Sequence, residues 1–314
     1  MAISRRDALK YSTILAASTA MAGSTNTSNP KVIKSNNKAR IADTNKPRVV
    51  VVGGGWAGLS VAKYTKIFAP NSDVILVEQR HEFISCPMSN LWLVDKINLE
   101  YLTHDYLQAA RNNNYTYFQA TATGLDKTNN ILHTSNGDIN YDYIIFACGI
   151  DYDYSRWTND IAFETRLRQD YPAGFIPGSE HITLKNKIKN FKGGNFILTV
   201  PSGNYRCLPA PYERACIIAD YFKSKKLDAK GILLDENNTV TIKKKGFESA
   251  FNELHGDYID YQVNTKILNI DLDKKVVTTE FDDIEFEDAA FYPHVRGARI
   301  LEFAGIAKDA KNML

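Results

Sequence analysis

The sequence is poor in several features that would point to particular classes of protein. Its 314 residues include four cysteines, none in a Cys-x-x-Cys arrangement, and six histidines scattered without metal-ligand spacing. These absences give little support to a zinc site or another metal centre. The formal net charge is only +2, so no nucleic-acid partner is expected. Beyond the first 22 residues, no apolar run reaches the roughly eighteen residues of a spanning helix, which predicts no membrane span.

The N-terminus has the layout of an export signal. Arg5 and Arg6 form a charged pair, a mild apolar stretch follows, and an Ala-Met-Ala cleavage site ends at Ala22. This order predicts a twin-arginine signal peptide over residues 1–22 and a periplasmic location. Ala8 departs from the pattern, because the usual motif has Phe there. The alternative is the charged start of an ordinary helix.

A first α/β domain is expected after a polar leader. Residues 23–46 are rich in Asn, Ser, Thr and Lys, which predicts a flexible segment. Residues 48–52 are an arginine and four valines, the pattern of a strand buried on both faces of a parallel sheet. A helix over 57–68 and a strand over 73–78 would complete a βαβ unit. We assign residues 47–157 to this domain.

A second α/β pattern follows the first. It starts with an apolar strand at 196–200, continues with a helix from about residue 212, and predicts a second domain over residues 158–290. Residues 291–314 are expected to begin an incomplete return to the first domain. The predicted fold class is therefore α/β, with two Rossmann-like doubly wound domains of the FAD/NAD(P)-linked disulfide-reductase type.

A glycine motif of the form G-x-G-x-x-G lies between the first strand and its helix. It consists of Gly53, Gly54, Gly55, Trp56, Ala57 and Gly58. The first glycine permits the tight turn, Gly55 lets the backbone approach a pyrophosphate, and Gly58 lets helix and strand pack closely. The helix start then offers unpaired N–H groups to the phosphates. The segment is therefore predicted to bind a dinucleotide.

Glu78 and the second domain together indicate which dinucleotide binds. Glu78 ends the second strand, where it can accept hydrogen bonds from the adenosine ribose. The first strand of the second domain is followed by residues 201–207, which contain no second G-x-G-x-x-G motif. A reductase that uses NAD would need that second turn, so we predict FAD and no nicotinamide.

The segment around Cys207 carries a family resemblance. Residues 205–215 read Tyr-Arg-Cys-Leu-Pro-Ala-Pro-Tyr-Glu-Arg-Ala and lead into a helix, so the helix start and Arg206 should lower the thiol pKa. The segment resembles the Arg-Cys-Pro-Pro-Gly-Pro-Tyr-Glu-Arg-Ala sequence of the flavoprotein subunit of flavocytochrome c sulfide dehydrogenase, which is related to sulfide:quinone oxidoreductases. Leu208 and Ala210 depart from it. Residues 83–90 and 141–149 resemble the same family.

The resemblance implies roles for particular residues. The cysteine matching Cys86 binds the flavin covalently in the family, the one matching Cys207 is half of a redox disulfide, and Glu213 matches a glutamate thought to act as acid or base. Gly149 ends a matching strand and is expected to contact the cofactor. Alternatively, Cys86 is a buried structural cysteine, and Glu213 is an acidic helix start favoured by the dipole.

The expected function is FAD-dependent oxidation of sulfide to sulfur or polysulfide, with electrons passed to a c-type cytochrome subunit. The chain ends where the family would continue toward its second redox cysteine. One alternative is therefore a shortened, inactive fragment that binds only FAD or a cytochrome. Another is a quinone-linked sulfide oxidoreductase, which normally needs a C-terminal membrane-binding helix pair.

Overall fold

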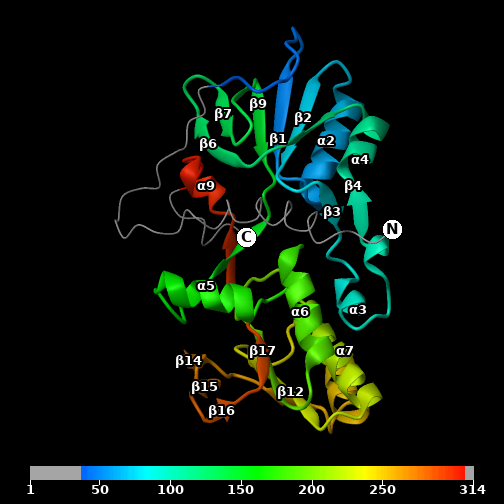
Figure 1. Ribbon diagram of the computed structural model, residues 1–314, viewed down its shortest axis with the longest axis vertical. Coiled ribbons are helices and arrows are strands. Elements are labelled where there is room, and N and C mark those ends of the chain that lie inside the picture. The colour runs from blue at the N-terminus through cyan, green and yellow to red at the C-terminus, as the bar shows by residue number, and fades with distance from the viewer. Residues whose placement is uncertain (1–36, 308–314) are drawn as a thin grey trace, which may run out of the picture. The chain divides into compact units, whose positions relative to one another are not determined.

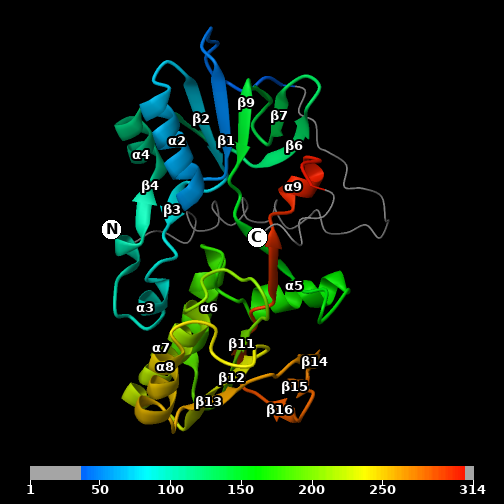
Figure 2. The same ribbon diagram turned by 180° about the vertical axis from the view of Figure 1, so that it is seen from behind.

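A computed structural model describes residues 37–307, all within one structural unit of the chain (Figures 1 and 2). The expected signal peptide at residues 1–22 lies outside this range. Part of the expected leader is included and contacts the fold, because Ala39 N donates to the Asp138 carbonyl at 2.9 Å. Within residues 37–307, no helix combines the length and apolar character needed to cross a membrane.

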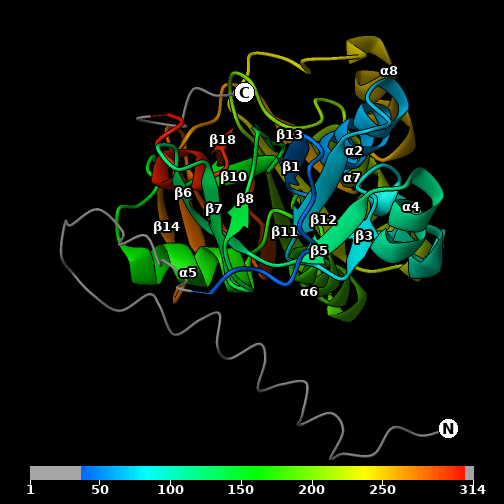
Figure 3. The same ribbon diagram turned by 90° about the horizontal axis from the view of Figure 1, so that it is seen from above.

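The first sheet is parallel and has four strands. In spatial order they are β5 (Thr116–Gln119), β2 (Asp73–Glu78), β1 (Arg48–Val52) and β9 (Tyr143–Phe146). Helices α2 (Trp56–Phe68) and α4 (Tyr106–Asn113) lie on one face, and the small antiparallel sheet of β6 (Ala122–Asp126), β7 (Ile131–Thr134) and β8 (Ile139–Asn140) lies on the other (Figure 3).

The valines of β1 explain why this strand lies at the centre of the sheet. Val49 and Val51 pack into the core under α2 and α4, whereas Val50 and Val52 pack toward Leu132 of the small sheet. Successive side chains of a strand point to opposite faces, so an unbroken valine run fills both cores. The expected strand and the expected βαβ unit are therefore present.

The second sheet repeats the same layout. Its parallel strands are, in spatial order, β13 (Ile259–Gln262), β12 (Ala229–Asp235), β11 (Gly194–Val200) and β17 (Asp288–Ala290). Its helices are α6 (Ser179–Asn190), α7 (Ala210–Lys225), α8 (Lys244–Ser249) and η2 (Ala250–Leu254). A small antiparallel sheet contains β14 (Ile267–Asp271), β15 (Val276–Thr279) and β16 (Asp283–Glu285).

Both parallel sheets have the strand order 3-2-1-4 when each is numbered by sequence. This is the order of a Rossmann mononucleotide-binding half extended by one strand. The predicted α/β class with tandem Rossmann-like domains is confirmed.

Two strands connect the sheets. The chain leaves the first sheet through β10 (Ile150–Asp153) and returns through β18 (His294–Gly297), and these strands pair antiparallel with Asp153 opposite His294. Helix α5 (Ile161–Asp170) follows β10, and α9 (Ile300–Phe303) follows β18. Helix α9 packs against β6, and Lys127 Nζ donates to the Gly305 carbonyl at 2.6 Å. The last described residues therefore contact the half of the fold that contains the first sheet, called the first half below; the second half contains the second sheet.

A loop of the first half extends to the second half. It contains β3 (Glu82–Ile84), α3 (Ser89–Leu93), η1 (Leu99–Tyr101) and β4 (Thr103–Asp105). Helix α3 packs against α6 and α7, and Trp92 and Leu93 belong to the core that surrounds the second sheet. This contact brings residues 86–90 next to the start of α7.

Candidate functional site

The glycine turn has the geometry that dinucleotide binding requires. Gly53 has φ +103°, and a Cβ on Gly58 would lie 1.7 Å from the Gly53 carbonyl oxygen. Only glycine fits at Gly58, because any side chain would overlap the turn. Gly55 differs, since a Cβ there would meet nothing within 4 Å. The backbone at Gly55 is therefore open to an approaching group, and α2 begins at Trp56 directly behind it.

Glu78 is held against this turn. Its buried carboxylate accepts from Gly54 N at 2.7 Å through Oε2 and from Arg80 N at 2.9 Å through Oε1. Tyr106 Oη donates to the Gly54 carbonyl at 2.8 Å. The carboxylate is thus fixed at the end of β2 beside the turn, the position at which a ribose is bound in Rossmann folds.

A cavity of about 780 Å³ opens at the carboxyl edge of the first sheet. Its volume lies within the roughly 300–1,000 Å³ of cofactor and ligand pockets. The cavity is lined by seven of the residues singled out from the sequence: Gly53, Gly55, Trp56, Ala57, Glu78, Cys86 and Gly149. Gly58 packs beneath the turn instead. One cavity therefore connects the glycine turn with Cys86.

Cys86 lies in this cavity next to a loop of the second half. Its Sγ is 3.8 Å from the Phe175 carbonyl oxygen. Burial raises the pKa of the Cys86 thiol, and the positive charges of Arg206, Arg214 and Arg80 oppose that rise. Arg80 and Arg206 also line the cavity. Cys86 is thus a half-buried thiol in a positively charged part of the cavity.

Cys207 and Glu213 lie beside the cavity rather than in its lining. Cys207 has a left-handed backbone with φ +61°, and its carbonyl accepts from Ala210 N at 2.9 Å as α7 begins. Glu213 follows on the first turn of α7. Cys207 is exposed to solvent, yet partial desolvation of its sulfur raises the pKa of the thiol and Glu213 adds to the rise, while the Ala210 N–H and Arg206 act in the opposite direction.

The helix start and Arg206 do lower the Cys207 pKa, but the net shift is upward, so the expectation of a lowered thiol pKa is wrong. Both features are present, but desolvation of the thiol outweighs them. A thiol with a raised pKa needs a nearby base to become a nucleophile.

Asn90 connects the Cys86 loop to the start of α7. Its Nδ2 donates to Glu213 Oε2 at 2.7 Å and to the Ala210 carbonyl at 3.3 Å, while its Oδ1 accepts from Arg214 Nε at 3.0 Å. The two cysteine-bearing segments, separated by more than a hundred residues in sequence, are thus joined through one buried amide.

The segment over residues 173–178 is part of the site, although no motif in the sequence predicts it. Its Ile176 and Pro177 line the cavity, its Phe175 carbonyl meets Cys86, and its Ala173 and Gly174 carbonyls accept from Arg214. A signal was present, because residues 172–178 read Pro-Ala-Gly-Phe-Ile-Pro-Gly, a composition typical of an ordered turn.

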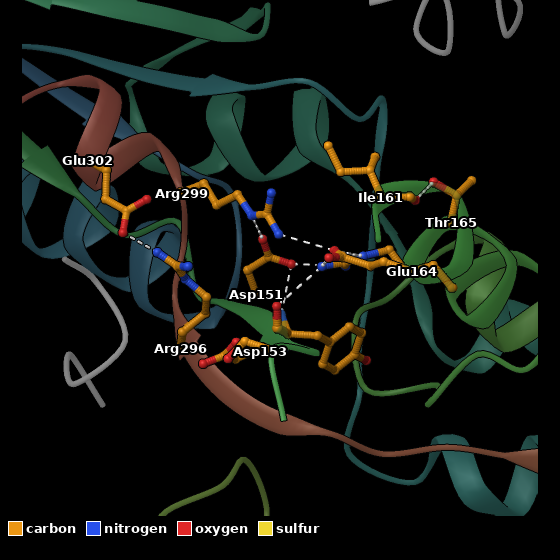
Figure 4. Close-up of polar contacts among 11 residues, drawn as sticks. Asp151, Asp153, Ile161, Glu164, Thr165, Arg296, Arg299 and Glu302 are labelled. Atoms are coloured by element: carbon orange, nitrogen blue, oxygen red, sulfur yellow. Dashed lines mark hydrogen bonds and ion pairs between the residues drawn. The ribbon is translucent and has the colours of Figure 1, made fainter. Parts of the chain in front are cut away.

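Charged residues form a network at the edge of the cavity (Figure 4). Asp151 pairs with Arg168 at 3.0 Å and with Arg299 at 2.9 Å, and Glu164 pairs with the same two arginines at 2.7 and 3.1 Å. Asp151 and Arg299 line the cavity. The network joins β10, α5 and the start of α9, and therefore fixes the connection between the sheets next to the site.

At the corresponding edge of the second sheet, the acidic side chains are hydrogen-bonded within the chain. Asp235, at the end of β12, is fully buried and accepts from the hydroxyls of Tyr212 at 2.8 Å and Tyr261 at 2.9 Å. The next residue, Glu236, accepts from Ser202 Oγ at 2.7 Å. These carboxylates hold the ribose-binding position of a Rossmann sheet, so their hydrogen-bonding capacity is used internally.

The fold and site define a class: a flavoprotein-type oxidoreductase with tandem Rossmann domains. The family model for pyridine nucleotide-disulphide oxidoreductases matches residues 47–158, and that for the central part of the sulfide dehydrogenase [flavocytochrome c] flavoprotein chain matches residues 182–290. A flavoprotein chain of that sulfide dehydrogenase from Chlorobaculum thiosulfatiphilum is 54% identical over 43 residues, 14% of this chain and 90% of the relative. The chain belongs to this family of sulfide dehydrogenase flavoprotein chains.

More distant relatives share the fold. The mitochondrial sulfide:quinone oxidoreductase of Dictyostelium discoideum is 26% identical over 200 residues, 62% of this chain and 42% of the relative. The structure of sulfide:quinone oxidoreductase from Aquifex aeolicus matches with a TM-score of 0.69 at 19% identity, over 82% of this chain and 61% of that one. The chain thus spans less than half of the Dictyostelium relative.

FAD is the cofactor that this class implies, and the residues present fit it. The open backbone at Gly55 and the start of α2 suit a pyrophosphate, and the Glu78 carboxylate suits an adenosine ribose. The cavity continues from there to Cys86 and Arg206. Within residues 37–307, no group of His, Cys, Asp and Glu side chains could hold a metal ion.

Proposed function

We propose that the chain oxidises sulfide with the help of bound FAD and passes the electrons to a c-type cytochrome. The observation that carries the proposal is the continuous cavity from Gly55 and Glu78 to Cys86, with Cys207 in the adjoining loop. Family membership supports the substrate class, since the relatives are named for sulfide.

The chemistry at Cys207 balances as a two-electron oxidation. The Cys207 thiolate and hydrosulfide form one S–S bond, giving a cysteine persulfide, one proton and two electrons. FAD, when bound, supplies the two-electron acceptor. Before this step Glu213 takes the proton of the Cys207 thiol, since its carboxylate lies on the first turn of α7 beside the Cys207 loop. The proton released when the S–S bond forms would leave with the two electrons to FAD or go to solvent. The raised pKa of the thiol makes this base necessary.

Positive charge in the cavity suits an anionic substrate. The guanidinium groups of Arg80 and Arg206 line the cavity, and their charges favour the thiolate form of Cys86. The same charges favour hydrosulfide over neutral hydrogen sulfide, because opposite charges attract more strongly in a partly desolvated site.

Replacement of Cys207 tests the proposal. Purified protein loaded with FAD is mixed anaerobically with sulfide, and loss of flavin absorbance is followed. We expect Cys207→Ser to abolish this bleaching. Cys216→Ser is the matched control, because Cys216 lies on α7 with a pKa raised to about 11 by burial and should behave as wild type. Unchanged bleaching in Cys207→Ser would reject the role of Cys207.

The electron acceptor is tested separately. We expect sulfide-dependent reduction of a c-type cytochrome at rates well above those with a water-soluble quinone. Faster quinone reduction would favour the quinone-linked alternative, which the identity to sulfide:quinone oxidoreductases also supports. Bleaching by sulfide with no transfer to either acceptor would contradict the cytochrome assignment.

A further inference from the structure

Asn90 is a buried side chain to which the proposed chemistry assigns no role. It is 5% exposed and lies on α3, four positions after Cys86. Its amide group makes hydrogen bonds to three groups at the start of α7: the Ala210 carbonyl, the Glu213 carboxylate and the Arg214 guanidinium. Because the amide nitrogen faces two acceptors and the amide oxygen faces a donor, only one orientation of the side chain satisfies all three contacts.

Two of the partners of Asn90, Glu213 and Arg214, carry opposite charges. Arg214 is buried, stacks on Phe175 at 4.2 Å, and donates to the carbonyls of Ala173 and Gly174. Its contacts within residues 37–307 are thus with an amide, two carbonyls and a ring rather than with a carboxylate, and the negative charge of Glu180 also acts on it. Glu213 is its neighbour in sequence, yet the Asn90 amide lies between the two charged groups and contacts both.

This arrangement matters for the Glu213 carboxylate, which must gain and lose a proton in the proposed reaction. A carboxylate locked in a direct ion pair with a buried arginine keeps its charge and is a poor base. A neutral amide donor orients the carboxylate without supplying a full opposite charge. Glu213 also acts on Cys207, because its negative charge contributes to the raised pKa of that thiol.

We infer that Asn90 is a positioning residue that holds the Glu213 carboxylate beside Cys207 and keeps it out of an ion pair with Arg214. The inference deepens the proposed function and rests on it for the role of Glu213 in sulfide oxidation. The placement of Glu213 relative to Cys207 can be measured without sulfide.

The first test measures alkylation of Cys207 by iodoacetamide in the full chain as a function of pH, with peptide mass spectrometry to separate it from the other cysteines. In Glu213→Gln the midpoint of the rate should fall by about half a pH unit, the size of a nearby screened charge. Asn90→Ala should lower the midpoint as far, because the released carboxylate pairs with Arg214 or turns toward solvent, and either change weakens its charge at Cys207. The double variant should show no further shift.

Asn237→Ala is the matched control. The Asn237 amide donates to Asp235 Oδ1 at 2.8 Å and to the Pro201 carbonyl at 3.1 Å, so the variant loses comparable hydrogen bonds without touching Glu213. Its midpoint should stay at the wild-type value. A wild-type midpoint in Asn90→Ala, or a shift that adds to that of Glu213→Gln, would overturn the inference.

The second test uses Asn90→Asp, which keeps the shape and the acceptor for Arg214 but places a carboxyl against Glu213 Oε2. Two carboxyl groups at such a distance share one proton. The acidic limb of sulfide-dependent flavin bleaching should therefore move up by about one pH unit or more. An unmoved limb contradicts the inference. If wild-type protein bleaches at no pH, the proposed function fails, and the alkylation test still decides the role of Asn90.

Discussion

Gly58 packs so closely against Gly53 that a Cβ on Gly58 would lie 1.7 Å from the Gly53 carbonyl oxygen. This contact holds α2 against the end of β1, and it sets the direction in which the helix start points. Gly55, between them, borders open space instead. Gly58 is therefore required for packing of the helix against the strand, whereas Gly55 leaves the backbone open to a ligand.

Alanine at these positions should separate the two roles. Gly58→Ala should unfold the first sheet or lower its melting temperature strongly, because no side chain fits. Gly55→Ala should fold normally, since its backbone is extended with φ −74° and its Cβ has room. Its flavin affinity should fall by about tenfold or more, because the methyl group keeps phosphate from the helix start. Thermal melting and flavin titration check this, and equal flavin affinity in Gly55→Ala would contradict it.

Covalent attachment of flavin through Cys86 predicts a particular mass. Wild-type protein that has matured with FAD should be heavier by one FAD, and its flavin absorbance should survive acid denaturation. Cys86→Ser should lose both properties. Cys148→Ser is the control, since Cys148 lines the same cavity but burial raises its pKa to about 12, which disfavours the reactive thiolate. The role of Cys86 would be rejected if Cys148→Ser lost the added FAD mass while Cys86→Ser kept it.

His181 should make the fold sensitive to acid. Burial lowers the pKa of His181 to about 3, and the positive charge of Arg214 lowers it further. The unfolded chain takes up a proton near pH 6.5 that the folded chain refuses, so stability is complete above pH 6.5 and falls as the pH drops toward 3. Between pH 7 and 5 this effect costs about 2 kcal/mol.

Urea unfolding at several pH values measures this effect. In His181→Gln the loss of unfolding free energy between pH 7 and 5 should be smaller by about 2 kcal/mol. His81→Gln is the control, because the His81 side chain is 79% exposed. An acid dependence in His181→Gln equal to that of wild type would show that the residue is not the cause.

The export signal predicted at residues 1–22 can be tested by a change that keeps its charge. Replacing Arg5 and Arg6 by lysine should leave the protein in the cytoplasm, because the twin-arginine route requires the arginine pair. Fractionation of cells that express the two forms gives the result. Periplasmic recovery of the lysine form would instead indicate another route of export.

The sequence predicts those parts of the fold that depend on neighbouring residues. The valines of β1, the glycines of the turn and the acidic residue at the end of β2 all lie within about thirty positions, and periodicity and spacing were enough to place them. The resemblance at residues 83–90 and 205–215 pointed to the same region of the structure that contains the cavity.

The parts that could not be predicted depend on contacts between distant residues. Asn90 and Arg214 are 124 positions apart, and no local pattern indicates that their side chains meet. The pKa of Cys207 was misjudged for the same reason, because a helix start and an arginine are visible in the sequence whereas desolvation is not. Burial is a property of the assembled chain.

The packing of α3 has a consequence for how the protein unfolds. Trp92 and Leu93 come from the half that carries the glycine turn, yet their side chains belong to the core around the second sheet, with Leu184 and Ile218. Removing that core would expose both residues, and removing the first half would leave a hole beside α6 and α7. The two Rossmann sheets are thus separate in topology but share apolar packing, which couples them into one cooperative unit in which neither sheet can lose its order without weakening the other.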